Sequence, residues 1–206
     1  MESESQKPTP YFSCNRLEAL TDGVFAIAMT LLVLGLEIPS IPRGDNGAEL
    51  ARAMSDLWLP LAKYAVSFLL AGAFWVLHVR QIHHIRRVDV TFLWLGMGSL
   101  LLVALLPFST SLVSDFPGRD AAEFFFHLNI LGISILFALQ WLHATKDRRL
   151  VSPDLPDEII ELDRRLNLLV PSIAILGLAT APVGSFESNL LYVTVPFLAA
   201  LLRKYS

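Results

Sequence analysis

The first long apolar run of the chain, residues 17–38, follows a short polar arm. Between residues 20 and 36 the only polar side chains are those of Thr21, Asp22 and Thr30. A helix rises about 1.5 Å per residue, so this run is long enough to cross the roughly 30 Å hydrocarbon layer of a membrane. The pattern predicts a membrane-spanning helix that begins with a carboxylate.

Successive residues of a helix are about 100° apart, which places an aliphatic stripe on one side of this first span. Asp22 lies on the opposite side from Ile27, and Thr30 borders the stripe. Such a stripe is usually a lipid-facing or packing surface, whereas a carboxylate near a membrane helix is costly and is usually paired. The residues within about 40° of Ile27 are Arg16, Leu20, Gly23, Leu31, Leu34 and Ile38.

Five further apolar stretches follow, so we predict an all-α chain with six spans. Pro107 lies within the third span, where Ser109 and Thr110 can accommodate it. Lys63 is expected to extend toward water from one end of the second span. Residues 1–206 are expected to form one six-span transmembrane domain. Its predicted spans are about 17–38, 57–79, 90–113, 124–143, 166–183 and 188–202.

The composition agrees with a polytopic membrane protein. Of the 206 residues, 54% are hydrophobic and 17% are charged, and the mean hydropathy is +0.55, outside the usual range of soluble domains. Basic residues gather in the N-terminal arm, in 80–87, in 146–165 and at the C-terminus. Because cytoplasmic loops are enriched in Lys and Arg, both termini are predicted to be cytoplasmic.

Few residues carry recognisable chemistry. Trp75 and His78 share one face of the second span, at the depth of Arg16 and Asp22, so a cross-helix polar cluster is one interpretation. An interfacial Trp beside an Arg that extends to water is an equal alternative. The histidines match no common metal-ligand spacing, and the sequence has no nucleophile elbow, phosphate loop or dinucleotide fingerprint. We expect no metal, cofactor, enzymatic activity or nucleic-acid binding.

The residues alone leave a channel, a transporter and a non-conducting scaffold open. The Thr-Val-Gly-Tyr-Gly filter of classical potassium channels is absent from the sequence, as are the regular arginines of a voltage sensor. Transporters tend to have internal repeats, and none is convincing between the two halves of this chain. A proton-coupled or small-solute secondary transporter would use Asp22 and His78 as a proton relay.

Arg16, three further residues and then Leu20, Thr21 and Asp22 resemble the signature of the transmembrane protein 175 family of endosomal and lysosomal potassium channels. In that signature an arginine and three residues precede Phe-Ser-Asp. The segments GVFAIAMTLLVL, FWVLHVRQIHHI and LPFSTSLV are similar to the family's first span, second-span Trp and His motif and third-span end. Animal members carry two six-span repeats, so this chain looks like a prokaryotic member of a bacterial inner membrane.

The resemblance implies a homotetrameric, potassium-selective cation channel whose first span lines a central pore. Ile27 would form the constriction, Leu31 and Leu34 would form further rings, and Thr30 would offer hydroxyls beside them. The expected partners are potassium ions, further copies of the chain and the lipid bilayer. The family's polar cluster, with a structural role, would map onto Arg16, Thr21, Asp22, Trp75 and His78.

Overall fold

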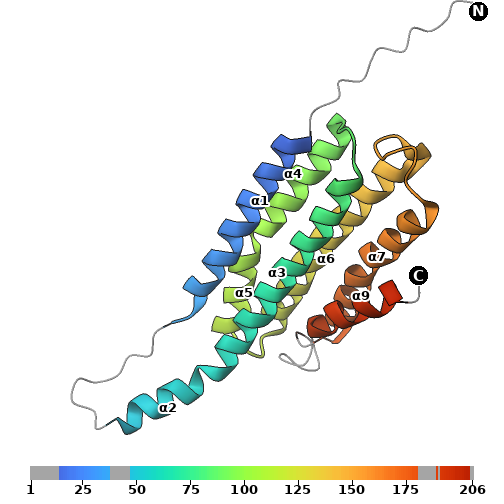
Figure 1. The fold of residues 1–206 in the computed structure, drawn as a ribbon. Helices are drawn as coiled ribbons and strands as arrows, with labels where there is room; N and C mark the ends of the chain where they lie inside the picture. The colour runs from blue at the N-terminus through green and yellow to red at the C-terminus, as the bar shows by residue number, and fades with distance from the viewer. Residues whose placement is uncertain (1–13, 38–46, 181–188, 190, 205–206) are drawn as a thin grey trace, which may run out of the picture.

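The computed structural model of the protein describes residues 14–37, 47–180, 189 and 191–204. Within these residues the chain is helical, apart from one isolated β-bridge between Ile85 and Val151. The predicted all-α class is confirmed. The helices in chain order are α1 (Cys14–Leu31), the 3₁₀ helix η1 (Leu32–Gly35), α2 (Ala48–Asp56), α3 (Trp58–His84), α4 (Val90–Ala104), α5 (Leu106–Asp115), α6 (Asp120–Thr145), the 3₁₀ helix η2 (Lys146–Arg148), α7 (Asp157–Thr180), the 3₁₀ helix η3 (Leu191–Thr194) and α9 (Val195–Lys204) (Figure 1).

The α6 helix is the most enclosed of the four long apolar stretches and packs against α4, α5 and α7. In its most apolar stretch 56% of the residues are buried, against 28% in the stretch that contains α1. Figure 1 shows α1 (blue) at one edge of the bundle and α7 and α9 (orange and red) at the other, with α3 between them. The first helix therefore packs on its own chain with one side only. Inward side chains of α6 include Ile130, Ile133, Phe137 and Trp141.

The third predicted span, 90–113, is not one uninterrupted helix. It is divided at Leu105 into α4 and α5, and Pro107 lies in the first turn of α5. Proline has no N–H to donate to the preceding turn, and its ring collides with a carbonyl of that turn. The helix is therefore interrupted just before the proline, while Val90–Asp115 as a whole is long and apolar enough to cross a membrane.

Other predicted boundaries differ at the ends of the spans. The fifth was expected at 166–183, but α7 begins at Asp157, so the helix includes polar residues that the predicted span left out. Residues 181–183 lie outside the described part of the chain, as do Ile38 of the first span and residues 188 and 190 of the sixth.

Large apolar side chains cover the outside of the bundle. Trp94, Leu101 and Phe197 each expose at least 71% of their surface. Soluble proteins rarely expose apolar surface on this scale, so the exterior is suited to lipid. Among the described residues, four helical stretches are long and apolar enough to cross a membrane: Cys14–Gly35, Glu49–His84, Val90–Asp115 and Asp120–Arg148.

The loop between α3 and α4 is fixed by Asp89, a carboxylate outside these apolar stretches. Its Oδ1 accepts a hydrogen bond of 2.8 Å from the backbone N–H of Phe92 and thereby caps α4. Its Oδ2 lies 2.8 Å from Nε2 of His143 on α6. Burial raises the pKa of Asp89, but these bonds outweigh burial and hold the pKa below its ordinary value.

Candidate functional site

The two sides of α1 have different surroundings. Leu17, Thr21, Phe25 and Ala28 are buried against the rest of the bundle. The opposite, aliphatic side makes far less contact with its own chain, since Ile27 is 61% exposed. The exposed members of the predicted stripe also include Leu20, Leu31 and Leu34.

Leu34 was expected on the exposed side from α-helical spacing, but it lies in a different type of helix. It lies in η1, a 3₁₀ helix that continues α1, where residues turn by about 120° instead of 100°. Its side chain is 75% exposed all the same. Thr30 is also exposed, and its hydroxyl donates a hydrogen bond of 2.8 Å to the carbonyl of Ile27. The apolar surface therefore continues beyond the α-helical part of the first span.

The structure brings together Asp22 of α1 and Trp75 of α3. The indole Nε1 of Trp75 donates a hydrogen bond of 2.8 Å to Oδ1 of Asp22. His78, one turn further along α3, is buried, and its Nε2 has no hydrogen-bond partner within the described residues. The carboxylate therefore has the polar partner that its position required, on a neighbouring helix of the same chain.

Two other residues expected in this cluster lie apart from the bond between Asp22 and Trp75. Thr21 is buried beside the core, with 2% of its surface exposed. Arg16 is exposed, and it forms no ion pair with Asp22 in the part of the chain that the structure describes. The interpretation of Arg16 as a side chain that extends to water agrees with this placement.

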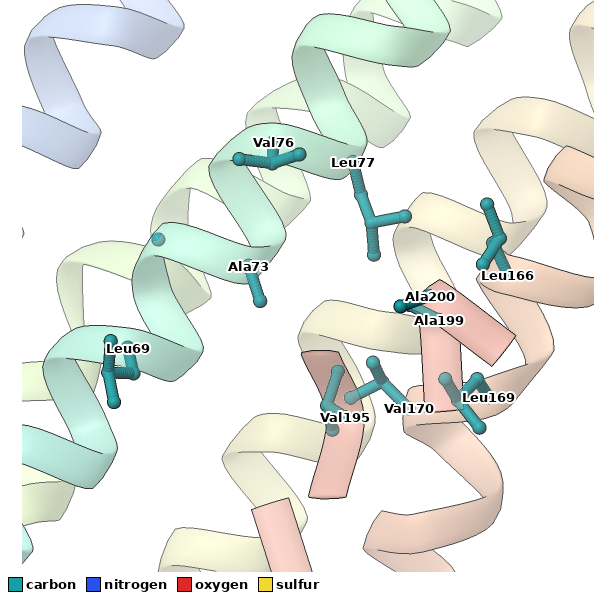
Figure 2. A pocket seen from close by; sticks show the side chains of 11 residues that line it. Leu69, Ala73, Val76, Leu77, Leu166, Leu169, Val170, Val195, Ala199 and Ala200 are labelled. Atoms are coloured by element: carbon teal, nitrogen blue, oxygen red, sulfur yellow. The ribbon is translucent and has the colours of Figure 1, made fainter. Parts of the chain in front are cut away.

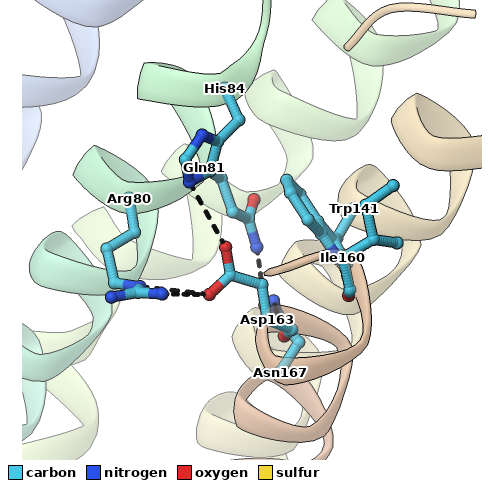
Figure 3. Close-up of polar contacts among 7 residues, drawn as sticks. All are labelled: Arg80, Gln81, His84, Trp141, Ile160, Asp163 and Asn167. Carbon is cyan, nitrogen blue, oxygen red and sulfur yellow. Dashed lines mark hydrogen bonds and ion pairs between the residues drawn. The ribbon is translucent and has the colours of Figure 1, made fainter. Parts of the chain in front are cut away.

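A second polar contact, which the sequence did not indicate, joins the end of α3 to α7. Arg80 donates from Nε (3.1 Å) and Nη2 (2.5 Å) to Oδ1 of Asp163, whose side chain is only 3% exposed (Figure 3). Nε2 of His84 lies 3.8 Å from the other carboxylate oxygen. Both Arg80 and Asp163 stand just outside the predicted spans, where charged residues were attributed to loops.

Next to this ion pair is a buried amide pair. Nε2 of Gln81 donates a hydrogen bond of 2.6 Å to Oδ1 of Asn167. Asn167 in turn donates to the backbone carbonyl of Asp163 at 2.7 Å. The sequence does not show which amide side chains will pair with each other, and these two residues are 86 positions apart. Only the packing of α3 on α7 reveals them.

Lys63 is placed differently from the prediction. Its side chain does not extend to water: it is 5% exposed, and Nζ donates a hydrogen bond of 2.8 Å to the carbonyl of Val113 at the end of α5. Glu123 of α6 is also completely buried and accepts a hydrogen bond of 2.8 Å from Asn189. The expectation of a water-exposed Lys63 was wrong because α5 and α6 cover this end of α3.

Comparison with known proteins tests the resemblance. The family described as endosomal/lysosomal potassium channel TMEM175 matches residues 16–107, from the start of α1 into α5. A protein named potassium channel from Streptomyces collinus is 33% identical over 142 residues, which cover 67% of this chain and 68% of that protein. A second, from Chamaesiphon minutus, is 30% identical over 190 residues, 90% of this chain and 91% of that protein. The chain belongs to the TMEM175 family.

Solved structures support the same assignment. The crystal structure of a lysosomal potassium-selective channel TMEM175 homolog from Chamaesiphon minutus has a TM-score of 0.78 and 26% identity, and the match covers 92% of this chain and 97% of that one. A vertebrate member from Danio rerio, named endosomal/lysosomal proton channel TMEM175, is 27% identical over 132 residues. The match spans 64% of this chain but only 25% of that protein. The family resemblance read from Arg16 to Asp22 is confirmed.

Proposed function

We propose that this TMEM175 family member is a potassium-conducting channel of a bacterial cell membrane, formed by four copies of the chain around α1. The two bacterial relatives are named potassium channels, and the family and its structural neighbours are ion channels and not enzymes. The observation that carries the proposal is the aliphatic stripe of α1, a helix at the bundle edge: its side chains are largely exposed and pack little on their own chain.

The stripe is suited to a pore because it is continuous and apolar. With four copies of α1 around one axis, Ile27 forms the narrowest ring, and Leu31 and Leu34 form rings further along. A ring of isoleucines closes a pore to ions by excluding water, and a small rotation of the helices re-admits it. The side of α1 opposite the stripe packs on the rest of the chain, so the stripe itself can change its position when α1 rotates.

Thr30 supplies a polar atom beside these rings. Its hydroxyl hydrogen is directed to the carbonyl of Ile27, so the lone pairs of Oγ1 point away from that bond. Oxygen lone pairs are the ligands that replace the hydration shell of an alkali cation. We assign Thr30 the role of stabilising a partly dehydrated potassium ion next to the constriction.

The polar cluster has a structural role in this proposal. The bond between Asp22 and Trp75 joins α1 to α3 of the same chain on the side away from Ile27. It therefore fixes how far α1 can rotate about its axis while leaving the stripe free. We assign His78, one turn from Trp75 on α3, and the buried Thr21 the same structural role, and we place Arg16 at the water-exposed end of α1. The proposal includes six spans in one domain, with both termini in the cytoplasm.

The direct test is ion flux through the purified protein in liposomes, with potassium and sodium gradients compared. The native chain is expected to pass potassium faster than sodium. Ile27→Ala, which widens the proposed constriction, should raise sodium flux and lower the preference for potassium. Ile175→Ala is the matched control, because Ile175 is 58% exposed on α7, close to the 61% of Ile27. Equal effects of the two variants would contradict a constriction at Ile27.

The buried, unpartnered Nε2 of His78 near Asp22 favours a second candidate, a proton-coupled transporter that uses these two residues. A transport cycle with conformational steps of about 1 μs to 1 ms cannot exceed about 10⁶ turnovers per second. Saturable, proton-coupled flux below this limit, with no effect of Ile27→Ala, would support the transporter. Absence of flux would indicate a scaffold.

A further inference from the structure

An apolar groove runs between α3, α7 and α9, on a part of the bundle that the proposed pore does not use. Its volume is about 280 Å³, and its lining side chains are all aliphatic. Figure 2 shows these side chains converging on one space from the three helices. Six of them define its walls: Leu69, Ala73, Val76, Leu166, Val170 and Val195.

The groove is open to the outside of the bundle and lies at the depth of the hydrocarbon. Leu69 and Val76, on its α3 wall, are 62% and 43% exposed. Both stand in the middle of α3, which is part of an apolar stretch long enough to cross a membrane. A membrane-facing opening at this depth admits methylene chains and excludes water.

The groove also lies away from the aliphatic stripe of α1. The main helix contacts of α1 are with α3, α4 and α5, whereas α7 contacts mainly α6 and α9. In Figure 1 the α7–α9 pair lies on the other side of α3 from α1. Copies of the chain arranged around α1 would leave this side at the periphery, in contact with lipid.

A cation stands at one end of the groove. Arg80 follows Val76 by four residues on the same face of α3, and its partner Asp163 precedes Leu166 by three residues on α7. The side chain of Arg80 is 30% exposed, and its bonds to Asp163 use Nε and Nη2. Among the described residues Nη1 has no hydrogen-bond acceptor, so it can donate to an anion outside the chain.

We propose that the groove binds one acyl chain of a membrane phospholipid, with the lipid phosphate hydrogen-bonded to Arg80. Small residues in the lining, Gly72, Ala73, Ala199 and Ala200, make room for a methylene chain. The guanidinium at its end complements a phosphate, and it is already held in place by the buried carboxylate of Asp163. Such a lipid joins α3 to α7 and α9 in the way that an extra side chain would.

The test uses the native protein in phosphatidylcholine liposomes that contain a trace of phosphatidylcholine with a photoreactive diazirine on its acyl chain. After illumination, mass spectrometry of peptides locates the label. The expected result is labelling concentrated on the α3 and α7 segments that line the groove. Labelling spread evenly over the exposed helices would overturn the proposal. A groove that stays unlabelled while other exposed helices are labelled would also overturn it.

Two variants fill the groove, and one matched variant does not. Ala73→Trp and Ala199→Trp place an indole inside it and should each reduce labelling of the groove. Ile175→Trp adds the same side chain to an exposed position of α7 outside the lining and should leave labelling unchanged. Size-exclusion profiles identify any variant that fails to fold. Unchanged labelling in a folded groove variant would contradict the proposal.

The phosphate contact is tested on the native chain with a diacylglycerol that carries the same photoreactive acyl chain but no phosphate. The phospholipid should label the groove about tenfold more strongly, which is the ratio that one charge-assisted hydrogen bond corresponds to. Equal labelling by the two probes would show an acyl-chain site without a phosphate contact, and would overturn the role of Arg80.

Discussion

Asp22 joins the first helix to its neighbour α3 by a side-chain hydrogen bond. Its partner Trp75 is 40% exposed, so the bond lies at the surface of the bundle and is not buried in the core. A carboxylate at this position can influence the proposed pore through the orientation of α1, without lining the pore itself. In our proposal, the bond to Trp75 fixes the angle at which α1 presents Ile27 to the other copies.

A double-mutant cycle measures this bond. Trp75→Phe removes the N–H and keeps most of the ring, and Asp22→Ala removes the acceptor. Each single variant should lower the free energy of unfolding. The double variant should lower it by less than the sum of the two single losses, because both substitutions remove the same bond. The expected coupling is about 0.5–1 kcal/mol, at the low end for a charged acceptor because the pair is exposed. Thermal unfolding of the purified variants checks it, and strict additivity would contradict it.

Asp22→Ala should also impair assembly more than ion selectivity. Without its bond to Trp75, α1 loses a fixed orientation, so copies of the stripe meet in several ways. Size-exclusion chromatography of the purified variant should show a smaller share of tetramers, while the tetramers that remain keep the native preference for potassium over sodium. Normal assembly with altered selectivity would place Asp22 in the ion path instead.

At the level of helices, α4 begins at Asp89 because that carboxylate accepts the N–H of Phe92. The folded-state pKa of Asp89 is lowered, so its stabilising effect is fully present above the ordinary carboxyl pKa of about 3.9 and is lost as the pH falls through the folded value. Asp89→Asn keeps a capping oxygen but does not titrate. The stability advantage of the native chain over this variant should shrink below about pH 4. A difference that is independent of pH, measured by thermal unfolding, would contradict the assignment.

The two partners of the ion pair between α3 and α7 differ in burial. The side chain of Asp163 is 3% exposed, whereas that of Arg80 is 30% exposed. Arg80→Met leaves a buried carboxylate without its cation, which costs about 3–5 kcal/mol. Asp163→Asn leaves an arginine that water can solvate, so we expect a cost of about 1–2 kcal/mol. Denaturation of the two variants compares these values. Equal destabilisation would show that the pair is solvated as a whole.

Sequence patterns predicted the helices better than the contacts between them. An apolar run of about 20 residues identifies a span because the membrane imposes its length, and all six predicted ranges overlap described helices. The division at Leu105 was harder to place, since a proline constrains the turn before it and not one bond alone. The burial of Lys63 depends on α5 and α6, which no local pattern contains.

For the candidate site, the residues of α1 were predictable and their partners were only partly so. The stripe around Ile27 follows from helical spacing, and its exposure agrees with that spacing. Asp22 and Trp75 were expected together, and they are bonded. The ion pair between Arg80 and Asp163 was not predicted, because charged residues at the ends of spans look like loop residues in a sequence. Only the packing of α3 and α7 identifies them as partners.

At the scale of the whole molecule, two of its apolar surfaces differ in their surroundings. The stripe of α1 stands at one edge of the bundle and, in our proposal, faces the other copies across a pore. The groove between α3, α7 and α9 lies away from it and, as we propose, binds a lipid chain. The contacts of Asp22 and Asp163 stand between these surfaces and hold their positions relative to each other.

The central claim, that Ile27 faces a conducting pore, is tested most directly by cadmium block. In a Cys14→Ser background, Ile27→Cys would place four thiols around the axis, where they bind Cd²⁺ tightly because soft metal ions prefer thiolate ligands. We predict that Cd²⁺ stops potassium flux through Ile27→Cys liposomes, that a chelator restores it, and that Ile175→Cys is unaffected. Undiminished flux through a conducting Ile27→Cys channel, or equal block of the control, would contradict the account.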